Sequence, residues 1–218
     1  MQNLSAIVLG ATGATGQELV RCLLEDPDYK KVFVFVRKKP KISHKKLTSY
    51  TIDFSKMKCY KELIKGDVLF SCFGTTLKTA GSKDKQFLVD YTYQYEFAKF
   101  ASKNGVKRYA LVSSSGAHSK SPFFYLKMKG KLEESVKKLK FKSIYIFQPP
   151  SLIRQDELLR NGEKLALRVI MGFNNLGFLK SQKPLPVSLL AKRMVNETKM
   201  PPEKKLKIFK NQEILNSI

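Results

Sequence analysis

Short apolar runs alternate along the chain with longer segments whose apolar residues recur at the three-to-four-residue spacing of a helix. Such short runs have the length and composition of buried strands. We predict strands over residues 6–9, 32–36, 48–52, 68–73, 109–112, 143–147 and 206–209. The intervening patterns predict helices over residues 17–25, 56–64, 85–102 and 127–138, and the Asn104-Gly105 pair is suited to end the third of these.

Regular alternation of strands and helices is typical of an α/β fold in which helices cover both faces of a parallel sheet. We therefore predict a doubly wound parallel sheet with strand order 3-2-1-4-5-6, in a single domain over residues 1–218. After Phe147, prolines interrupt the pattern. We expect residues 148–205 to form a small C-terminal cap on the substrate side, with helices near residues 162–172 and 187–196.

The bulk composition is that of an ordinary globular protein, with 43% hydrophobic residues in a chain of 218. No apolar run approaches the roughly 20 residues of a membrane span, and the N-terminus lacks the pattern of a signal peptide. These features predict a cytoplasmic protein with no membrane partner. Cys22, Cys59 and Cys72 lie in apolar patterns and are interpreted as core thiols. His44 and His118 lie far apart without other ligands at metal-binding spacing, so we expect no metal site.

The formal net charge of +23 raises the question of a nucleic-acid partner. The basic residues are 34 Lys and 7 Arg, however, and they are spread along the whole chain rather than gathered in one stripe. Recognition of bases and phosphates by a planar fork favours Arg over Lys. We interpret most of the charge as a solvated surface, with no nucleic-acid binding beyond nonspecific attraction.

The first predicted strand runs directly into the sequence GATGATG, which opens the first predicted helix. Glycines three apart in a strand-to-helix turn are typical of a dinucleotide-binding, Rossmann-type turn. Gly10 permits the tight turn, Gly13 lets the backbone approach a pyrophosphate, and Gly16 lets the helix pack closely on the strand. The predicted pyrophosphate site at the helix N-terminus comprises Gly10, Ala11, Thr12, Gly13, Ala14, Thr15 and Gly16.

The residues that close the second predicted strand bear on which dinucleotide is bound. An NAD-binding turn usually has an acidic residue there, which accepts a hydrogen bond from the ribose 2′-hydroxyl. This chain has Arg37, Lys38 and Lys39 instead, with no acid nearby. A guanidinium and an ammonium would pair with a 2′-phosphate, so NADP(H) is favoured over NAD(H). The alternative is a basic surface turn like others in this lysine-rich chain.

A second motif lies further along, where Tyr125 and Lys129 stand four residues apart at the start of a predicted helix. That spacing places phenol and ammonium on one helix face, where the positive charge would favour the phenolate. A Tyr in this setting can exchange a proton with a substrate oxygen while hydride moves to or from a nicotinamide. Upstream, Ser113, Ser114 and Ser115 end a strand, and one of these hydroxyls could orient the substrate oxygen.

In this order of motifs the chain resembles an atypical short-chain dehydrogenase/reductase, and more narrowly the Tat-interacting-protein-like NAD(P)-binding oxidoreductases. The resemblance runs from GATGATGQELV through VFVRKKP, GTTLKTAGSKDKQFLVDY, LVSSSGA and FYLKMKGKLEE to FQPPSLI, RNGE, PLPVSLLAKRM and KIFKNQEI. It implies catalytic roles for Ser114, Tyr125 and Lys129.

The resemblance also implies cofactor contacts that spacing alone does not give. Asp53 and Phe54 would lie at the adenine, and Arg37 at the 2′-phosphate. The ribose and nicotinamide would lie beside Cys72, Phe73, Gly74, Thr75, Tyr125 and Lys129, and the carboxamide beside Gln148, Pro149 and Leu152. The family usually has Arg where Gln148 stands and a smaller residue than Pro150.

These features predict an NADP-dependent oxidoreductase that acts on a small carbonyl or alcohol through a Ser-Tyr-Lys site. A rival hypothesis is a regulatory protein that binds NADPH as a sensor and acts through a protein partner. Formation of a homodimer is a further possibility that the sequence leaves open. A nucleotide-sugar epimerase or dehydratase is a third, although such enzymes normally have a larger substrate domain. Presence of Ser114, Tyr125 and Lys129 together favours the enzyme, because a sensor does not need all three.

Overall fold

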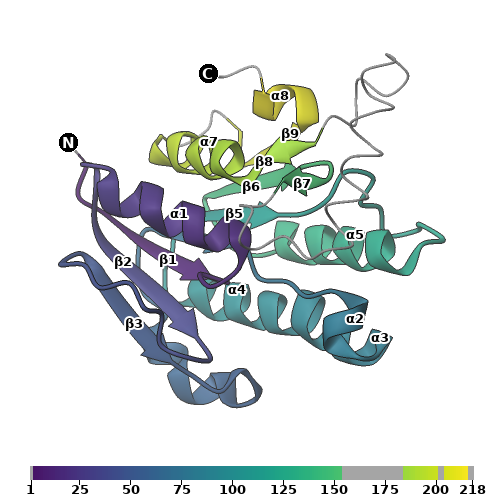
Figure 1. Ribbon diagram of the computed structural model, residues 1–218, viewed down its shortest axis with the longest axis horizontal. Helices are drawn as coiled ribbons and strands as arrows, with labels where there is room; N and C mark the ends of the chain where they lie inside the picture. The colour runs from purple at the N-terminus through teal and green to yellow at the C-terminus, as the bar shows by residue number, and fades with distance from the viewer. Residues whose placement is uncertain (1, 154–183, 201–203, 216–218) are drawn as a thin grey trace.

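The computed structural model describes residues 2–153, 184–200 and 204–215, and these form a parallel sheet between two layers of helices (Figure 1). The sheet has seven strands in the order β3-β2-β1-β4-β5-β6-β9, all paired in parallel. Their bounds are β1 Leu4–Leu9, β2 Tyr29–Val36, β3 Leu47–Thr51, β4 Val68–Ser71, β5 Arg108–Val112, β6 Ser143–Gln148 and β9 Leu206–Lys210. The predicted doubly wound fold and strand order are confirmed.

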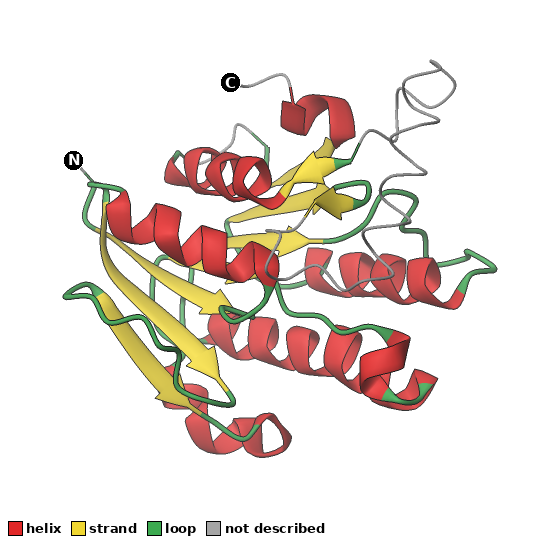
Figure 2. Cartoon of the chain, viewed as in Figure 1, coloured by secondary structure: helices red, strands yellow, loops and turns green. Residues whose placement is uncertain are grey.

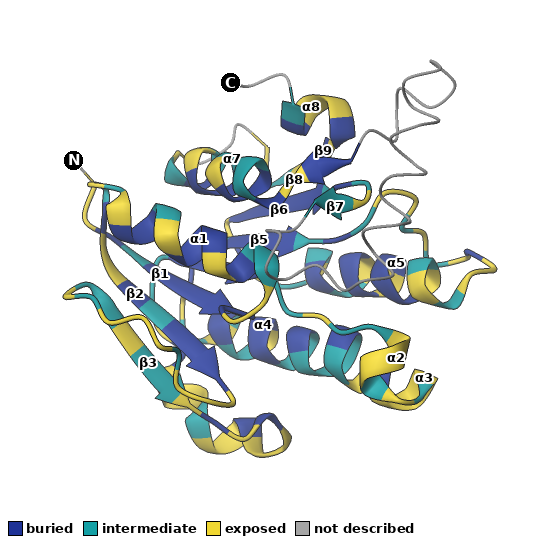
Figure 3. Cartoon of the chain, in the orientation of Figure 1, coloured by how far each residue is buried: buried dark blue, intermediate teal, exposed yellow. Residues whose placement is uncertain are grey.

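Alternate residues of each central strand face opposite layers, as the two-residue period of a strand requires. Ala6 and Val8 of β1 face a cluster with α1 (Ala14–Glu25), α7 (Val187–Lys199) and α8 (Asn211–Leu215). Ile7 and Leu9 face a second cluster, with the 3₁₀ helix η1 (Phe54–Leu63), α4 (Gln94–Lys103) and α5 (Phe124–Lys137). Both faces of the sheet are thus covered (Figures 2 and 3), which explains why its strands are apolar runs without alternation.

The strand order places β1 between β2 and β4. The chain therefore adds β2 and β3 on one side of β1 and then crosses over to add β4 and the later strands on the other side. Ligands of such sheets bind at this switch point, beyond the carboxyl ends of the strands. Here the turn after β1 touches the loop after β4, since Cys72 N–H donates to the Leu9 carbonyl over 2.9 Å. The fold therefore brings the glycine turn and residues 72–75 together.

Two helical segments differ in form from the predicted helices. The helix predicted over residues 85–102 is three joined segments: α3 (Lys83–Phe87), the π-helix η2 (Leu88–Tyr93) and α4. The segment predicted over residues 56–64 is the 3₁₀ helix η1, which Asp53 caps by accepting from Ser55 N–H. Its residue Lys56 has non-helical backbone angles, and the Asp53 cap sets the start of the helix at Phe54.

Several short elements have no counterpart in the sequence prediction. They are α2 (Leu77–Ala80), α8 and the two-stranded sheet of β7 (Leu152–Ile153) and β8 (Leu185–Pro186). Strand β4 ends at Ser71 rather than at residue 73, so Cys72 and Phe73 belong to the loop that faces the switch point. The Asn104-Gly105 helix end is confirmed, with Gly105 at a φ of 82°.

The predicted cap divides between described and undescribed residues. Its helix over 187–196 is α7, which packs against α1 in the layer that covers the sheet, with Leu190 and Met194 fully buried. It is therefore part of the core layer. The helix predicted near residues 162–172 lies outside the described residues.

Candidate cofactor and active site

Two of the three glycines in the turn after β1 are required by the fold. Gly10 has a φ of +89°, and a Cβ there would lie 2.7 Å from the Cys72 carbonyl. A Cβ on Gly16 would lie 2.0 Å from the Gly10 carbonyl oxygen. At Gly13 the nearest atom would be 3.5 Å away, which is an ordinary contact. Among the described residues no neighbour requires glycine at position 13, and the space left there is what a pyrophosphate at a helix N-terminus needs.

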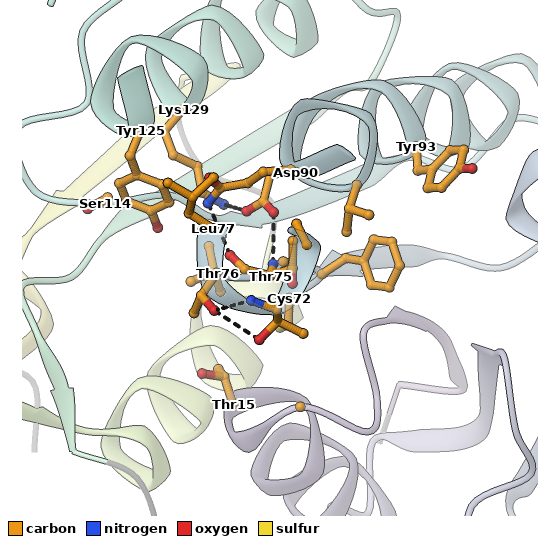
Figure 4. Close-up of a pocket in the computed structure, with 18 of the residues that line it drawn as sticks. Thr15, Cys72, Thr75, Thr76, Leu77, Asp90, Tyr93, Ser114, Tyr125 and Lys129 are labelled. Atoms are coloured by element: carbon orange, nitrogen blue, oxygen red, sulfur yellow. Dashed lines mark hydrogen bonds and ion pairs between the residues drawn. The ribbon is translucent and has the colours of Figure 1, made fainter. Parts of the chain in front are cut away.

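A cavity of about 1420 Å³ extends along the carboxyl edge of the sheet from this turn to the start of α5 (Figure 4). Its volume exceeds the ~300–1,000 Å³ of sites for drug-sized ligands, as expected for a dinucleotide and a substrate together. The predicted site residues that line it are Gly13, Ala14, Thr15, Arg37, Asp53, Phe54, Cys72, Phe73, Gly74, Thr75, Ser114, Tyr125, Lys129, Pro149 and Leu152. Those that do not are Gly10, Ala11, Thr12, Gly16, Lys38 and Gln148.

One end of the cavity is formed by the ends of β2 and β3. Arg37 follows β2, is exposed, and forms no ion pair with any other residue in the described ranges. The Asp53 carboxylate accepts from Ser55 N–H over 2.9 Å and from Ser55 Oγ over 2.6 Å, and these bonds lower the pKa of the Asp53 carboxyl. The ring of Phe54 stacks on that of Phe73, with centroids 4.9 Å apart. This end therefore offers a guanidinium that no described carboxylate pairs with, beside an aromatic wall.

The middle of the cavity is bounded by the loop after β4. Thr75 N–H donates to Asp90 Oδ2 over 2.8 Å, and Gln86 Nε2 donates to the Thr75 carbonyl over 3.3 Å. Loss of solvation raises the pKa of the Cys72 thiol to about 12, so this thiol is neutral. Both side-chain contacts come from the helical stretch that begins at α3, which fixes the loop along the cavity wall.

The structure distinguishes the three consecutive serines that follow β5. Ser113 is buried, and its hydroxyl donates to Glu133 Oε1 over 2.5 Å. Ser114 lies at the cavity, where within the described ranges its hydroxyl makes only a long 3.4 Å contact with the Ser115 carbonyl. Ser115 is exposed and does not line the cavity. Of the three hydroxyls, that of Ser114 is the one available to a ligand in the cavity.

Tyr125 and Lys129 lie in the first two turns of α5 on the face toward the cavity (Figure 4). Tyr125 is 40% exposed, whereas Lys129 is 4% exposed. Lys129 Nζ lies 5.9 Å from the centroid of the Tyr125 ring and 3.7 Å from Asp90 Oδ1. The predicted pair thus shares one wall with Ser114, with the ammonium beneath the phenol.

Gln148 is turned away from the cavity. Its Nε2 donates to both carboxylate oxygens of Glu133, over 2.9 and 3.1 Å, and the same carboxylate accepts from Ser113. Neighbouring Pro149 and Leu152 line the cavity. Gln148 therefore joins the end of β6 to α5 and holds the main chain beside the site.

The structure adds cavity residues that the sequence analysis did not select, and they include Thr76, Leu77, Lys83, Gln86, Asp90, Tyr93, Phe124 and Val187. Of these residues, Asp90 could have been selected from the sequence pattern. Asp90 lies four and seven residues before Gln94 and Phe97, so it shares the apolar face of the helix predicted over residues 85–102. An acid in that position must be buried beside a partner.

A parallel sheet with a glycine turn at its switch point defines a nucleotide-binding α/β protein, and Ser114, Tyr125 and Lys129 lie at the same edge of this sheet. The family model described as NAD(P)H-binding matches residues 10–161. Protein HTATIP2 of Rattus norvegicus is 33% identical over 221 residues, which cover 99% of this chain and 90% of the relative. The mitochondrial protein FMP52 of Meyerozyma guilliermondii is 39% identical over 156 residues, 70% of this chain and 66% of the relative.

Among solved structures, the Bordetella bronchiseptica enzyme WbmG in complex with NAD has a similar fold, with a TM-score of 0.70 and 13% identity. The match covers 95% of this chain and 72% of that one. The chain belongs to the NAD(P)H-binding, atypical short-chain dehydrogenase/reductase family. The family resemblance seen in the sequence is confirmed.

The expectation of a cytoplasmic protein is wrong. Relatives that include the FMP52 proteins of Meyerozyma guilliermondii and Saccharomyces cerevisiae are named as mitochondrial. Absence of a recognisable signal peptide or apolar span was the basis of the prediction, and such an absence does not assign a compartment. Within the described ranges no helix is long and apolar enough to cross a membrane, and no group of three potential ligands could hold a metal ion.

Proposed function

We propose that this protein is an NADP-dependent oxidoreductase that interconverts a small carbonyl compound and its alcohol. The observation that carries the proposal is a single cavity lined by Gly13, Arg37, Ser114, Tyr125 and Lys129. These residues come from four separate parts of the chain, since Tyr125 and Lys129 share α5, and an NADP-dependent dehydrogenase reaction needs all of them at one ligand. The fold and the family make a nicotinamide dinucleotide the expected occupant.

The residues of the cavity fit such a cofactor along its length. The space at Gly13, above the start of α1, suits the pyrophosphate, and α1 has no side-chain cap to compete for its first N–H groups. Arg37 can bind a 2′-phosphate there. Among the described residues, Asp53 is the only carboxylate that lines this end of the cavity, and it already accepts two hydrogen bonds from Ser55. This arrangement supports NADP(H) over NAD(H).

The remaining residues account for the proton that accompanies hydride transfer. Bound in the cavity, the cofactor would supply hydride to the substrate carbon or accept it. In reduction, the Tyr125 hydroxyl donates its proton to the substrate oxygen, and Lys129 stabilises the phenolate that remains. Ser114 donates a hydrogen bond to the same oxygen. In oxidation the Tyr125 oxygen accepts the proton instead.

The test is replacement of Tyr125 by Phe, which removes the hydroxyl and leaves the ring. Turnover of a carbonyl found in a screen of aldehydes and ketones, followed by NADPH absorbance, should fall at least ~100-fold because the proton donor is gone. The affinity for NADPH should stay within about threefold of wild type.

Tyr95→Phe is the matched control, because it removes a phenol hydroxyl outside the cavity and should keep full turnover. Unchanged turnover in Tyr125→Phe would remove Tyr125 from the mechanism. A wild-type protein that binds NADPH but reduces no carbonyl in the screen would contradict the proposed activity and support the sensor hypothesis.

A further inference from the structure

The wall of the cavity contains a buried ion pair that the proposed hydride chemistry does not by itself require. Lys129 Nζ lies 3.7 Å from Asp90 Oδ1, and their side chains are 5% and 2% exposed (Figure 4). Burying two charges is costly, and a hydrophobic pair of similar volume is often equally stable or more so. A pair kept at this position therefore suggests a purpose other than stability.

Asp90 holds two walls of the cavity at once. While Oδ1 faces Lys129 on α5, Oδ2 accepts from Thr75 N–H over 2.8 Å in the loop after β4. The approach is close enough that a Cβ on Gly74 would lie 3.1 Å from Asp90 Oδ1. One carboxylate thus fixes the distance between the loop and the lysine.

Asp90 is itself anchored to the sheet. It lies in the π-helical segment η2, and short π-helical segments are frequent at functional sites. Its carbonyl accepts from Gln94 Nε2 over 2.6 Å, and Gln94 Oε1 accepts from Ser71 Oγ of β4 over 2.8 Å. The carboxylate is therefore presented from a rigid position.

Among the described residues, Asp90 is the carboxylate that pairs with Lys129. From the loop after β4, Lys129 meets the Cys72 thiol, which burial keeps neutral by raising its pKa to about 12. On its own helix it meets Tyr125, and Glu133 one turn further on, which is bonded to Ser113 and Gln148. Burial raises the pKa of the Asp90 carboxyl, while Lys129 and the Thr75 N–H favour its ionised form. The ionised form of Asp90 is therefore favoured by its contacts with Lys129 and the Thr75 N–H.

We propose that Asp90 is a positioning residue of the site, which keeps Lys129 charged beneath Tyr125 and clamps the Gly74-Thr75 loop against it. A buried amine without a counter-charge favours its neutral form. A neutral Lys129 could not stabilise the Tyr125 phenolate, and a flexible lysine stem would not stay under the ring. The kinetic consequence rests on the proposed function, whereas the charge state of Lys129 does not.

Asp90→Asn separates the counter-charge for Lys129 from the clamp on the loop. Asn keeps the size of Asp and an acceptor for the Thr75 N–H, but it carries no charge. The first measurement needs neither substrate nor cofactor. Acetic anhydride modifies only neutral amines, and mass spectrometry reports how much Lys129 reacts between about pH 7 and 10 relative to exposed Lys65. Lys129 should react at least about fivefold faster in Asp90→Asn than in wild type.

Kinetics supply the second measurement. In Asp90→Asn, kcat should fall at least about tenfold, and the decline of kcat/KM at alkaline pH should begin at lower pH than in wild type. Asp90→Asn should have no further effect in a Lys129→Met background, because residues that act through one another are not additive. Asp84→Asn is the control: it makes the same substitution at an exposed carboxylate that does not line the cavity, so labelling and pH profile should match wild type.

The outcomes are distinguishable. Equal labelling of Lys129 in wild type and Asp90→Asn overturns the proposal. Faster labelling without carbonyl turnover by any form, wild type included, leaves the role of Asp90 standing and contradicts the proposed activity. If Asp90→Asn alone does not fold, recovery of folding in Asp90→Asn/Lys129→Met supports the counter-charge, whereas an unfolded double variant overturns it in favour of a purely structural bond to the loop.

Discussion

At the scale of single residues, the glycine turn shows how one motif combines folding and binding requirements. Gly10 and Gly16 are needed because main-chain atoms occupy the space of their missing side chains. Gly13 has an ordinary φ of −82° and an open Cβ direction that faces the cavity. Within the described residues no neighbour accounts for glycine at this position, and the pyrophosphate of the proposed cofactor is the reason we propose for it.

Gly13→Ala and Gly16→Ala should separate these requirements. Gly13→Ala should fold with a Tm close to wild type, because the new methyl meets nothing closer than 3.5 Å. Its affinity for NADPH should fall at least about tenfold, or about 1.4 kcal/mol, as the methyl enters the pyrophosphate space. Thermal unfolding and titration with NADPH measure the two effects.

Gly16→Ala is the contrasting variant, since its methyl would lie 2.0 Å from the Gly10 carbonyl oxygen. Its free energy of unfolding should fall by about 3 kcal/mol or more. NADPH affinity unchanged in Gly13→Ala would show that the cofactor does not pass this glycine.

Some site residues could be predicted from the sequence and others could not. Tyr125 and Lys129 are four apart on one helix, so local geometry is enough to pair them. The choice of Ser114 depends on Glu133 holding Ser113, which is a contact across elements. Asp90 and Lys129 are brought together by the packing of η2 against α5, and no sequence spacing reports that contact.

At the scale of elements, the central strands were predictable because burial on both faces makes them continuous apolar runs. The π-helical segment was not, since the hydrophobic pattern of residues 85–102 reads as one uninterrupted helix. Short elements such as α2 and β7 have too few residues to show a period. Three of the elements that sequence patterns missed, α2, η2 and β7, contribute residues to the cavity wall, whereas α8 and β8 do not.

Helix α5 carries Tyr125 and Lys129, and Gly130 sets how closely it approaches the loop after β5. A Cβ on Gly130 would lie 2.2 Å from the His118 carbonyl carbon. Alanine in a helix interior normally stabilises by about 0.5–1 kcal/mol relative to glycine. Gly130→Ala should instead lower the free energy of unfolding by about 1–3 kcal/mol, because the helix must move away from the loop.

Chemical denaturation measures that change, with Lys131→Ala as an exposed control on the same helix that should remain within about 0.5 kcal/mol of wild type. Turnover of Gly130→Ala should also fall, since the loop carries Ser114 and the helix carries Tyr125. A stabilised Gly130→Ala would contradict the close packing described here.

At the scale of the whole molecule, the sheet order brings three separate regions to one edge: the turn after β1, the end of β2 and the start of α5. The sequence predicts this convergence because a doubly wound sheet has one switch point. The net charge of +23 adds a general attraction for anions, which salt screens, while a bound 2′-phosphate would be held by Arg37 at short range. A preference for NADP(H) over NAD(H) that depends on Arg37 therefore distinguishes a specific 2′-phosphate site from general attraction to a basic surface.

The most direct measurement is a calorimetric titration of NADPH and of NADH into wild type, Arg37→Ala and Lys39→Ala at near-physiological salt. Lys39 is the control, because it is an exposed neighbour that does not line the cavity. Wild type and Lys39→Ala should bind NADPH at least about tenfold more tightly than NADH, as expected from charge-assisted bonds worth about 1.5–3 kcal/mol. Arg37→Ala should lose that preference and keep its affinity for NADH. Equal affinity of wild type for the two cofactors, or binding of neither, would contradict the assignment of an NADP(H) site.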